Sequence, residues 1–86
     1  MSCDMLTRVW NTQTEPRRKL VLVELADNTG DGFAWRADVK WLARFACCSE
    51  SQAREELEAL QRDGKIINVR ETRDGYFEGE FARRVA

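Results

Sequence analysis

The residue types that carry out most enzyme chemistry are scarce in this chain. The 86-residue sequence has no histidine, which removes Ser-His-Asp and Cys-His arrangements and the commonest acid and base near neutral pH. Of its three cysteines, Cys47 and Cys48 are adjacent, and no second ligand pair follows that could complete a zinc site. We therefore expect no enzyme, no cofactor and no bound metal.

One segment, residues 49–62, carries side chains that are able to read the edges of DNA bases. Gln52 suits adenine, Arg54 suits guanine, and a glutamate such as Glu55 can accept a hydrogen bond from cytosine. Basic side chains elsewhere in the chain could bind phosphates. The candidate DNA-binding residues are Arg36, Lys40, Arg44, Ser49, Ser51, Gln52, Arg54, Arg70 and Arg73.

The charge of the chain is balanced. Fourteen Lys and Arg against fifteen Asp and Glu give a net charge of -1, whereas a chain that coats nucleic acid indiscriminately usually has a basic excess. Residues 49–64 nevertheless hold five acidic residues against two basic ones. Three interpretations of this segment stay open: it contacts DNA, it contacts a protein, or Arg54, Glu58 and Arg62 form intrahelical pairs on a solvated face.

Capping residues and apolar spacing predict three helices. Pro16 favours the start of the first, over residues 17–28, although the β-branched run within it also allows a buried strand. The second is a short helix whose apolar stripe consists of Val39, Leu42, Ala43 and Ala46. Ser49 is the expected N-cap of the third helix, which ends at Gly64.

Strand signals complete the predicted fold. Residues 33–35 indicate a short edge strand, and residues 65–70 and 76–81 flank an Asp-Gly turn that is typical of a hairpin. Residues 1–13 lack sustained periodicity, so we expect an irregular N-terminal arm before a single domain of residues 14–86. Two central helices joined by a tight turn and followed by a hairpin predict an α+β, mainly α, winged helix-turn-helix fold with three helices, a short strand and a C-terminal hairpin wing.

The aromatic side chains are expected to lie mostly in the core, because no RNA-recognition signature surrounds them. The predicted core aromatics are Trp10, Phe33, Trp35 and Phe45. Trp41 lies off the apolar stripe of its helix, so we expect it to be partly exposed and to mark a protein interface. Cys48 is expected in the core, where free cysteines are often buried.

The chain also resembles a known family. The resemblance is carried by Val9-Trp10, residues 18–27, Gly32-Phe33-Ala34-Trp35, Leu42-Ala43-Arg44, Ser49, Leu57, Leu60 and Gly64-Lys65-Ile66-Ile67. These residues resemble the helix-turn-helix domain of phage and prophage replication-initiation proteins and small phage winged-helix regulators. The resemblance implies sequence-specific binding of double-stranded DNA, with residues 49–62 in a major groove. Cys47 stands in the turn where that family usually has glycine.

Two functions follow as hypotheses. The first is double-stranded DNA binding in transcription regulation or DNA replication, and the alternative is an adaptor that binds a host or phage protein through its acidic third helix. No dimerisation helix is evident, so a homodimer would need Trp10 or the hairpin edge. The sequence shows no secretion signal and no apolar run near the roughly 20 residues that cross a bilayer. We expect a protein of the cytoplasm, the host cytoplasm if phage-encoded, that does not associate with membranes.

Overall fold

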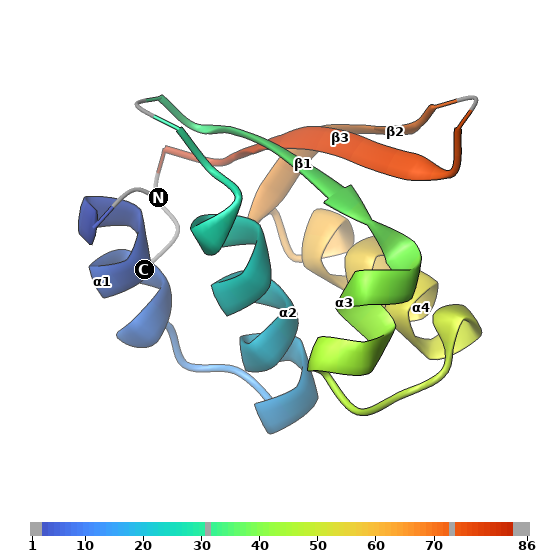
Figure 1. Ribbon diagram of the computed structural model, residues 1–86. Coiled ribbons are helices and arrows are strands. Elements are labelled where there is room, and N and C mark those ends of the chain that lie inside the picture. Colours follow the sequence, from blue (N-terminus) through green and yellow to red (C-terminus); the bar gives the residue numbers. More distant parts are fainter. Residues whose placement is uncertain (1–2, 31, 73, 84–86) are drawn as a thin grey trace.

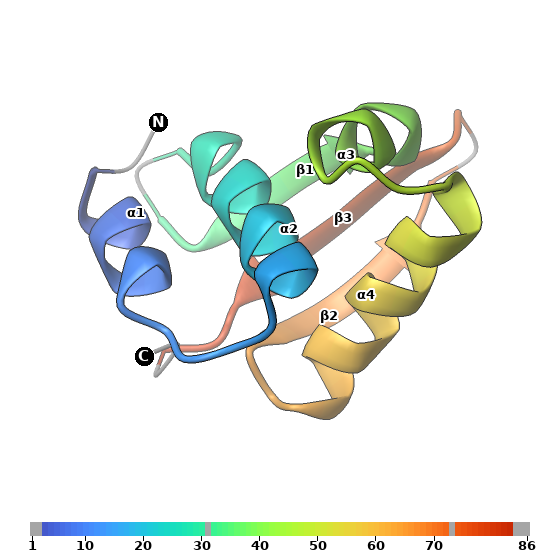
Figure 2. The ribbon, with the colours of Figure 1, turned by 90° about the horizontal axis from the view of Figure 1, so that it is seen from below.

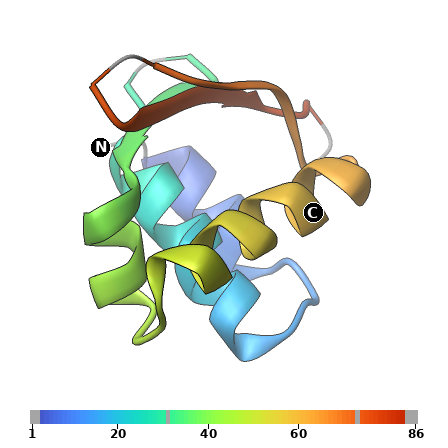
Figure 3. The same ribbon diagram turned by 90° about the vertical axis from the view of Figure 1, so that its right-hand side faces the viewer.

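The computed structural model describes residues 3–30, 32–72 and 74–83, which form helices and a three-stranded antiparallel sheet. The elements are α1(Cys3–Trp10), α2(Pro16–Asp27), β1(Ala34–Asp38), α3(Val39–Phe45), α4(Glu50–Arg62), β2(Ile66–Glu71) and β3(Tyr76–Phe81). All the helices lie on one side of the sheet (Figures 1 and 3). The α+β class is as predicted, but the described residues form four helices rather than three.

Helix α1 is the main departure from the sequence prediction. We expected an irregular arm, but Cys3–Trp10 is helical and packs against α2. Met5 and Val9, one turn apart, are buried in the common core. Trp10 follows Val9 on the helix surface and is 67% exposed, so its predicted place in the core is wrong. Only two turns are present, too few for apolar periodicity to stand out from the sequence.

The three helices predicted from capping and apolar spacing are present. Helix α2 starts at the predicted proline, and the buried-strand alternative is wrong. The predicted stripe of α3 is buried: Val39, Leu42, Ala43 and Ala46. Phe45 lies off this stripe with 40% of its surface exposed, so its expected place in the core is also wrong. Helix α4 begins after Ser49 and buries Ala53, Leu57 and Leu60.

Helix α2 lies at the centre of the helical layer. It contacts α1, α3, α4 and β1, and Figure 2 shows it between α1 and the α3–α4 pair. Its buried residues Val21, Leu22 and Leu25 have no exposed surface. The mutual arrangement of α3 and α4 is therefore fixed by apolar contacts to a common helix.

The sheet has the strand order β1-β3-β2, so β1 is an edge strand, as predicted. Side chains alternate between the two faces: Trp35 is buried toward the helices, and the neighbouring Arg36 is exposed. Trp35 lies opposite Gly79 of β3. A Cβ atom on Gly79 would lie 2.6 Å from Cζ2 of the indole, so glycine is required for the ring to lie against the strand.

Strand β2 contains a bulge that sets the pairing of the hairpin. The register with β3 shifts between Ile67 and Arg70. Asn68, within this interval, adopts φ 56°, a left-handed conformation that asparagine tolerates better than most residues. Continuing the register of Ile67 would place Val69 opposite Glu78, but the extra residue places Arg70 there instead.

Candidate nucleic-acid interface

The turn between α3 and α4 has a left-handed residue at its centre. Cys47 has φ 55°. The N–H of Cys48 donates to the carbonyl of Ala43 at 2.9 Å, and the N–H of Cys47 donates to that of Arg44 at 3.3 Å. These two bonds form a Schellman motif, which usually has glycine at the left-handed position. Cysteine here costs about 1 kcal/mol relative to glycine, but the turn keeps its geometry.

Ser49 and Gln52, two predicted DNA-binding residues, cap helix α4. The Oγ of Ser49 accepts from the backbone N–H of Gln52 at 3.1 Å, and the N–H of Ser49 donates to Oε1 of Gln52 at 3.0 Å. This capping box satisfies two backbone donors. A bidentate contact to adenine needs the same amide oxygen, so Gln52 would have to leave the cap to read a base. Ser51 is exposed and makes no such contact within the described residues.

Two of the five acidic residues of segment 49–64 are engaged by Arg18 of α2. Glu56 is only 8% exposed, and its carboxylate lies 3.4 Å from the guanidinium of Arg18. The same guanidinium lies 3.7 Å from Asp63. The remaining charged residues of the segment are Glu50, Glu55, Glu58, Arg54 and Arg62. The solvent-facing side of α4 is therefore closer to neutral than the sequence count indicates.

Arg54 reaches from α4 to the hairpin. Its Nη1 donates to Oε1 of Glu71 at 2.7 Å, and its guanidinium lies 5.3 Å from the ring centre of Phe77. The hydrogen bond to Glu71 raises the pKa of Arg54 above its ordinary value. Within the described ranges no ion pair joins Arg54, Glu58 and Arg62 to one another, so the intrahelical pairing, one of the three interpretations left open by the sequence, is not formed.

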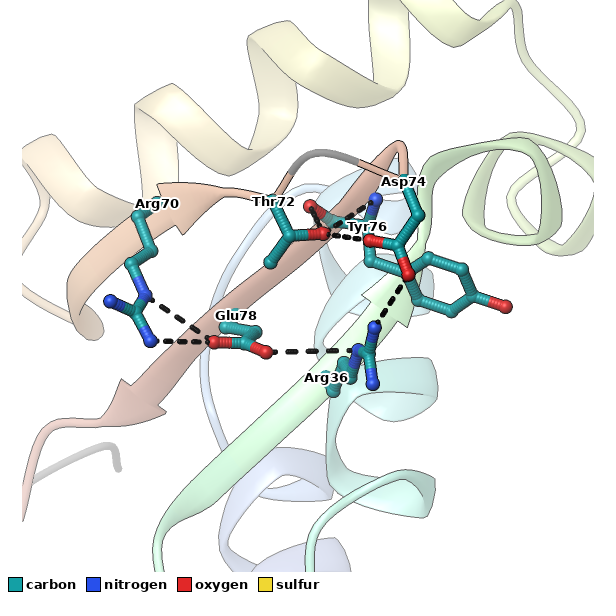
Figure 4. Close-up of polar contacts among 6 residues, drawn as sticks. All are labelled: Arg36, Arg70, Thr72, Asp74, Tyr76 and Glu78. Carbon is teal, nitrogen blue, oxygen red and sulfur yellow. Dashed lines mark hydrogen bonds and ion pairs between the residues drawn. The ribbon is translucent and has the colours of Figure 1, made fainter.

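An ion-pair network crosses the solvent face of the sheet (Figure 4). Arg70 donates to one carboxylate oxygen of Glu78, through Nε at 3.3 Å and Nη2 at 3.0 Å, while Nε of Arg36 lies 3.7 Å from the other oxygen. Arg36 also donates to Asp74 at 3.0 Å and stacks on Tyr76, 4.5 Å from its ring centre. Both predicted phosphate-binding arginines of the sheet thus have carboxylate partners.

The hairpin turn is held by Thr72 and Asp74. The Thr72 hydroxyl donates to Asp74 Oδ1 at 2.5 Å, as the close-up shows (Figure 4). Hydrogen bonds from Thr72 and from the backbone N–H of Asp74 itself, together with the nearby charge of Arg36, hold the pKa of Asp74 below its ordinary value. Arg73, another predicted DNA-binding residue, lies outside the described residues.

The exposed side of α3 carries two cations that, unlike the two arginines of the sheet, have no carboxylate partner within the described residues. Lys40 and Arg44 are one turn apart and exposed, and neither forms an ion pair within residues 3–30, 32–72 and 74–83. The Arg44 guanidinium lies 5.9 Å from the ring centre of Trp41. Trp41 is 55% exposed, as predicted, and α3 contains no acidic residue. The nearest carboxylate contact that the structure shows on this helix is the N-cap Asp38, which accepts from the backbone N–H of Lys40 and not from its ammonium.

The carboxylates that engage the arginines were absent from the predicted set. Glu78 has a sequence signal in principle, because a hairpin centred on its Asp-Gly turn places this residue opposite β2 near Arg70. Which residue of β2 lies directly opposite Glu78 depends on the bulge, and the bulge was not predicted from the sequence. Glu71 has no such signal, because it lies 17 residues from Arg54 and meets it only through the packing of α4 on the sheet.

Other predicted features can be placed as well. Cys47 is an exposed free thiol, and Cys48 is a half-buried one that packs against the core. In the part of the chain that the structure describes, no helix could span a bilayer, and no three metal-binding side chains gather. Comparison of the chain with known protein families, curated proteins and solved structures finds no match. The candidate interface is therefore defined by its own residues alone.

Proposed function

We propose that this chain is a winged-helix protein that binds double-stranded DNA with sequence preference, as a regulator or replication accessory of phage or prophage type. The element order α2, β1, α3, α4 and the β2–β3 hairpin, with a tight turn between α3 and α4, supports this. In the proposal α4 enters the major groove and the hairpin acts as the wing. The observation that carries it is the solvent-facing surface of α3 and α4, with cations on α3 that form no ion pair within the described residues and the hydrogen-bonding side chains of Ser51 and Arg54 on α4.

Lys40 and Arg44 supply the phosphate contacts that position the protein. Contacts to phosphate dominate the affinity of most DNA-binding proteins. Because neither side chain is in an ion pair within the described residues, no internal pair has to break before they bind a phosphate. Their position on α3, just before the turn to α4, suits contact with the backbone beside the groove that α4 occupies.

Ser51 and Arg54 read base edges. Arg36 and Arg70 lie on the face of the sheet turned away from the helices (Figure 1), so in the proposal they contact the DNA backbone along the wing and not beside α4. Each of these arginines must leave a carboxylate to do so: Arg54 leaves Glu71, and Arg70 leaves Glu78. Exposed ion pairs contribute little to stability because water screens them, so exchange for a guanine edge or a phosphate is inexpensive. Ser49 and Gln52 act indirectly in this proposal, by fixing the first turn of α4.

Selection from random duplexes followed by gel shifts tests the proposal. We expect a preferred sequence, and Arg54→Ala should relax the preference at one base position. The Lys40→Ala, Arg44→Ala double variant should weaken binding to all duplexes by about tenfold or more and reduce the slope of log affinity against log salt by about two. The matched control is Arg8→Ala on α1, at the far end of the helical layer (Figure 2).

The control variant should bind duplexes as the unchanged protein does. If selection yields no preferred sequence and the Lys40→Ala, Arg44→Ala variant binds as tightly as the Arg8→Ala variant, the proposal is wrong. A sequence preference that survives loss of Arg54 would assign base reading to other side chains of α4.

A second candidate function is favoured by the exposed glutamates of α4. Glu50, Glu55 and Glu58 are exposed, and none forms an ion pair within the described residues. A basic surface of another protein could pair with them, which would make the chain an adaptor. The same gel shifts separate the two functions, because a base-specific footprint with a steep salt dependence requires α4 to face DNA.

A further inference from the structure

The exposed side of α2 carries a stripe of residues that the proposed DNA contact does not use. We call it the α2 stripe: Arg17, Leu20, Val23 and Asp27. The spacing of three, three and four positions keeps these residues on one side of a helix. Leu20 is 36% exposed, Val23 is half-buried, and both charged residues are exposed.

The two charges of the α2 stripe lie at opposite ends and are unpaired. Neither Arg17 nor Asp27 forms an ion pair within the described part of the chain. They are ten positions apart, which is about 15 Å along a helix axis. Leu20 and Val23 lie between them, close to the midpoint. The stripe is therefore positive at its N-terminal end, apolar in the middle and negative at its C-terminal end.

An apolar groove borders the stripe. It lies between α1 and α2, has a volume of about 370 Å³ and is lined by Leu6, Thr7, Trp10, Asn11 and Val23. Trp10 is 67% exposed. Its position is fixed by Lys19, whose ammonium donates to the carbonyls of Trp10 and Thr12 and lies 5.6 Å from the centre of the indole. A large, exposed apolar side chain thus lies in the same groove as Val23 of the stripe.

We propose that the α2 stripe and this groove form the interface of a homodimer, in which the α2 helices of two copies pack antiparallel about a twofold axis. A twofold interface uses the same patch on both copies, so the patch must complement itself. Antiparallel packing places Arg17 of each copy opposite Asp27 of the other, because the two residues are equidistant from the centre of the stripe. Leu20 and Val23 then meet across the axis.

The charge pattern identifies a second copy as the occupant. A partner of uniform charge would meet attraction at one end of the stripe and repulsion at the other. A second α2 helix in antiparallel orientation satisfies both ends at once, and each Trp10 lies at the edge of the contact with its exposed ring toward the other copy's groove. The patch takes its residues from α1, α2 and the segment between them, and it includes none of the side chains proposed to contact DNA. Asp27, at its end, also lines a hollow with Trp41 of α3.

Sedimentation velocity of the full chain over a range of concentrations tests the dimer. The patch is small, so we expect a weak, concentration-dependent dimer with a dissociation constant of roughly 1–100 μM. Arg17→Asp places two carboxylates opposite each other at both ends of the contact, and Asp27→Arg does the same with two cations. Each variant should weaken dimerisation by about tenfold or more.

Mixing the two variants is the decisive measurement. In a mixed dimer Asp at position 17 of one copy faces Arg at position 27 of the other, and the natural Arg17 and Asp27 face each other at the second end. We expect the mixture to dimerise nearly as well as the unchanged chain, and the Arg17→Asp, Asp27→Arg double variant to self-associate likewise. Glu55→Arg on α4 is the matched charge reversal outside the patch and should leave dimerisation unaltered.

Each possible result of these measurements either supports the proposed dimer or overturns it. An unchanged chain that stays monomeric up to about 1 mM overturns the proposal. So does a dimer that neither single variant weakens, or a mixture that recovers no association although thermal unfolding shows both variants to be folded. Because duplex binding is measured separately, a failure here leaves the proposed DNA contact standing, and the reverse also holds.

Discussion

The two faces of the sheet are built from opposite kinds of contact. On the face toward the helices Trp35 lies against Gly79, and Phe81 pairs with Ile66, with almost no exposed surface. On the solvent face Arg36, Glu78 and Arg70 form ion pairs across the three strands. The first face depends on close steric fit, whereas the second depends on side chains that water can solvate individually.

The two kinds of contact differ in how much free energy it takes to disturb them. Close-packed apolar contacts are costly to disturb because the surrounding atoms can move only slightly. Opening an exposed ion pair costs little free energy of unfolding, so the arginines of the solvent face can change partner while the fold stays intact. The same strand, β3, supplies both kinds of contact on alternate residues, Gly79 inward and Glu78 outward.

The largest effect is expected on the inner face. Gly79→Ala places a Cβ 2.6 Å from Cζ2 of Trp35 and 3.2 Å from the carbonyl oxygen of Ile67. Either the indole or the strand must move, and we expect a loss of about 2–3 kcal/mol in the free energy of unfolding, which lowers Tm by roughly 8 °C or more. Urea and thermal unfolding measure it.

The control and the cause of this loss can be tested together. Gly32→Ala adds a Cβ that meets nothing within 4 Å and should change stability by less than about 0.5 kcal/mol. The indole N–H of Trp35 is buried without a partner among the described residues, so packing rather than hydrogen bonding holds the ring. Gly79→Ala should therefore cost less in a Trp35→Phe background; an unchanged cost would place the clash elsewhere.

The sequence predicted features that depend on neighbouring residues better than features that depend on packing between elements. Apolar spacing predicted the buried sides of α3 and α4, because these features repeat with the helical period. The capping role of Ser49 followed from its residue type at the start of that pattern. The sequence prediction missed α1, and it placed Trp10 and Phe45 in the core. Large aromatic residues are usually buried, but in these two helices smaller residues form the buried side.

The candidate site was harder to predict than the fold. The basic residues were proposed from residue type alone, and the partners of Arg54 and Arg70, which are Glu71 and Glu78, lie on other elements. Which arginine meets which carboxylate depends on the bulge at Asn68 and on the packing of α4. Residue types alone therefore could not separate the free cations of α3 from the paired arginines of the hairpin.

A smaller effect is expected when the network of the solvent face is cut. Glu78→Gln removes the carboxylate that engages both Arg36 and Arg70, and we expect stability to fall by less than about 1 kcal/mol. If the proposed DNA contact is correct, duplex binding should tighten several-fold, because Arg70 is released, Arg36 keeps only Asp74 as a partner, and one negative charge is lost. Unfolding and gel shifts on the same sample measure both effects.

The matched control for this variant is Glu80→Gln on the same strand and the same face. Glu80 accepts a hydrogen bond from Asn68 rather than from an arginine, so its substitution removes one charge without releasing a guanidinium. Equal tightening by both variants would attribute the effect to net charge alone and would remove Arg36 and Arg70 from the proposed contact.

The smallest expected effect is on the pH dependence of the free energy of unfolding. Its sign differs between an exposed carboxylate, Asp74, and a buried one, Glu24. The pKa of Asp74 is lower in the folded chain than in the unfolded one, so its stabilisation is present above the unfolded pKa, about 3.9, and is lost as the pH falls below it. Burial raises the pKa of Glu24, so its contribution is present below its unfolded pKa, about 4.3, and is lost as the pH rises through the folded value. Unfolding measured between about pH 2 and pH 7 should therefore show less loss of stability in acid for Asp74→Asn and less loss toward neutral pH for Glu24→Gln. If both variants changed the pH dependence of stability in the same direction, the exposed Asp74 of the turn and the buried Glu24 of α2 would not differ as expected.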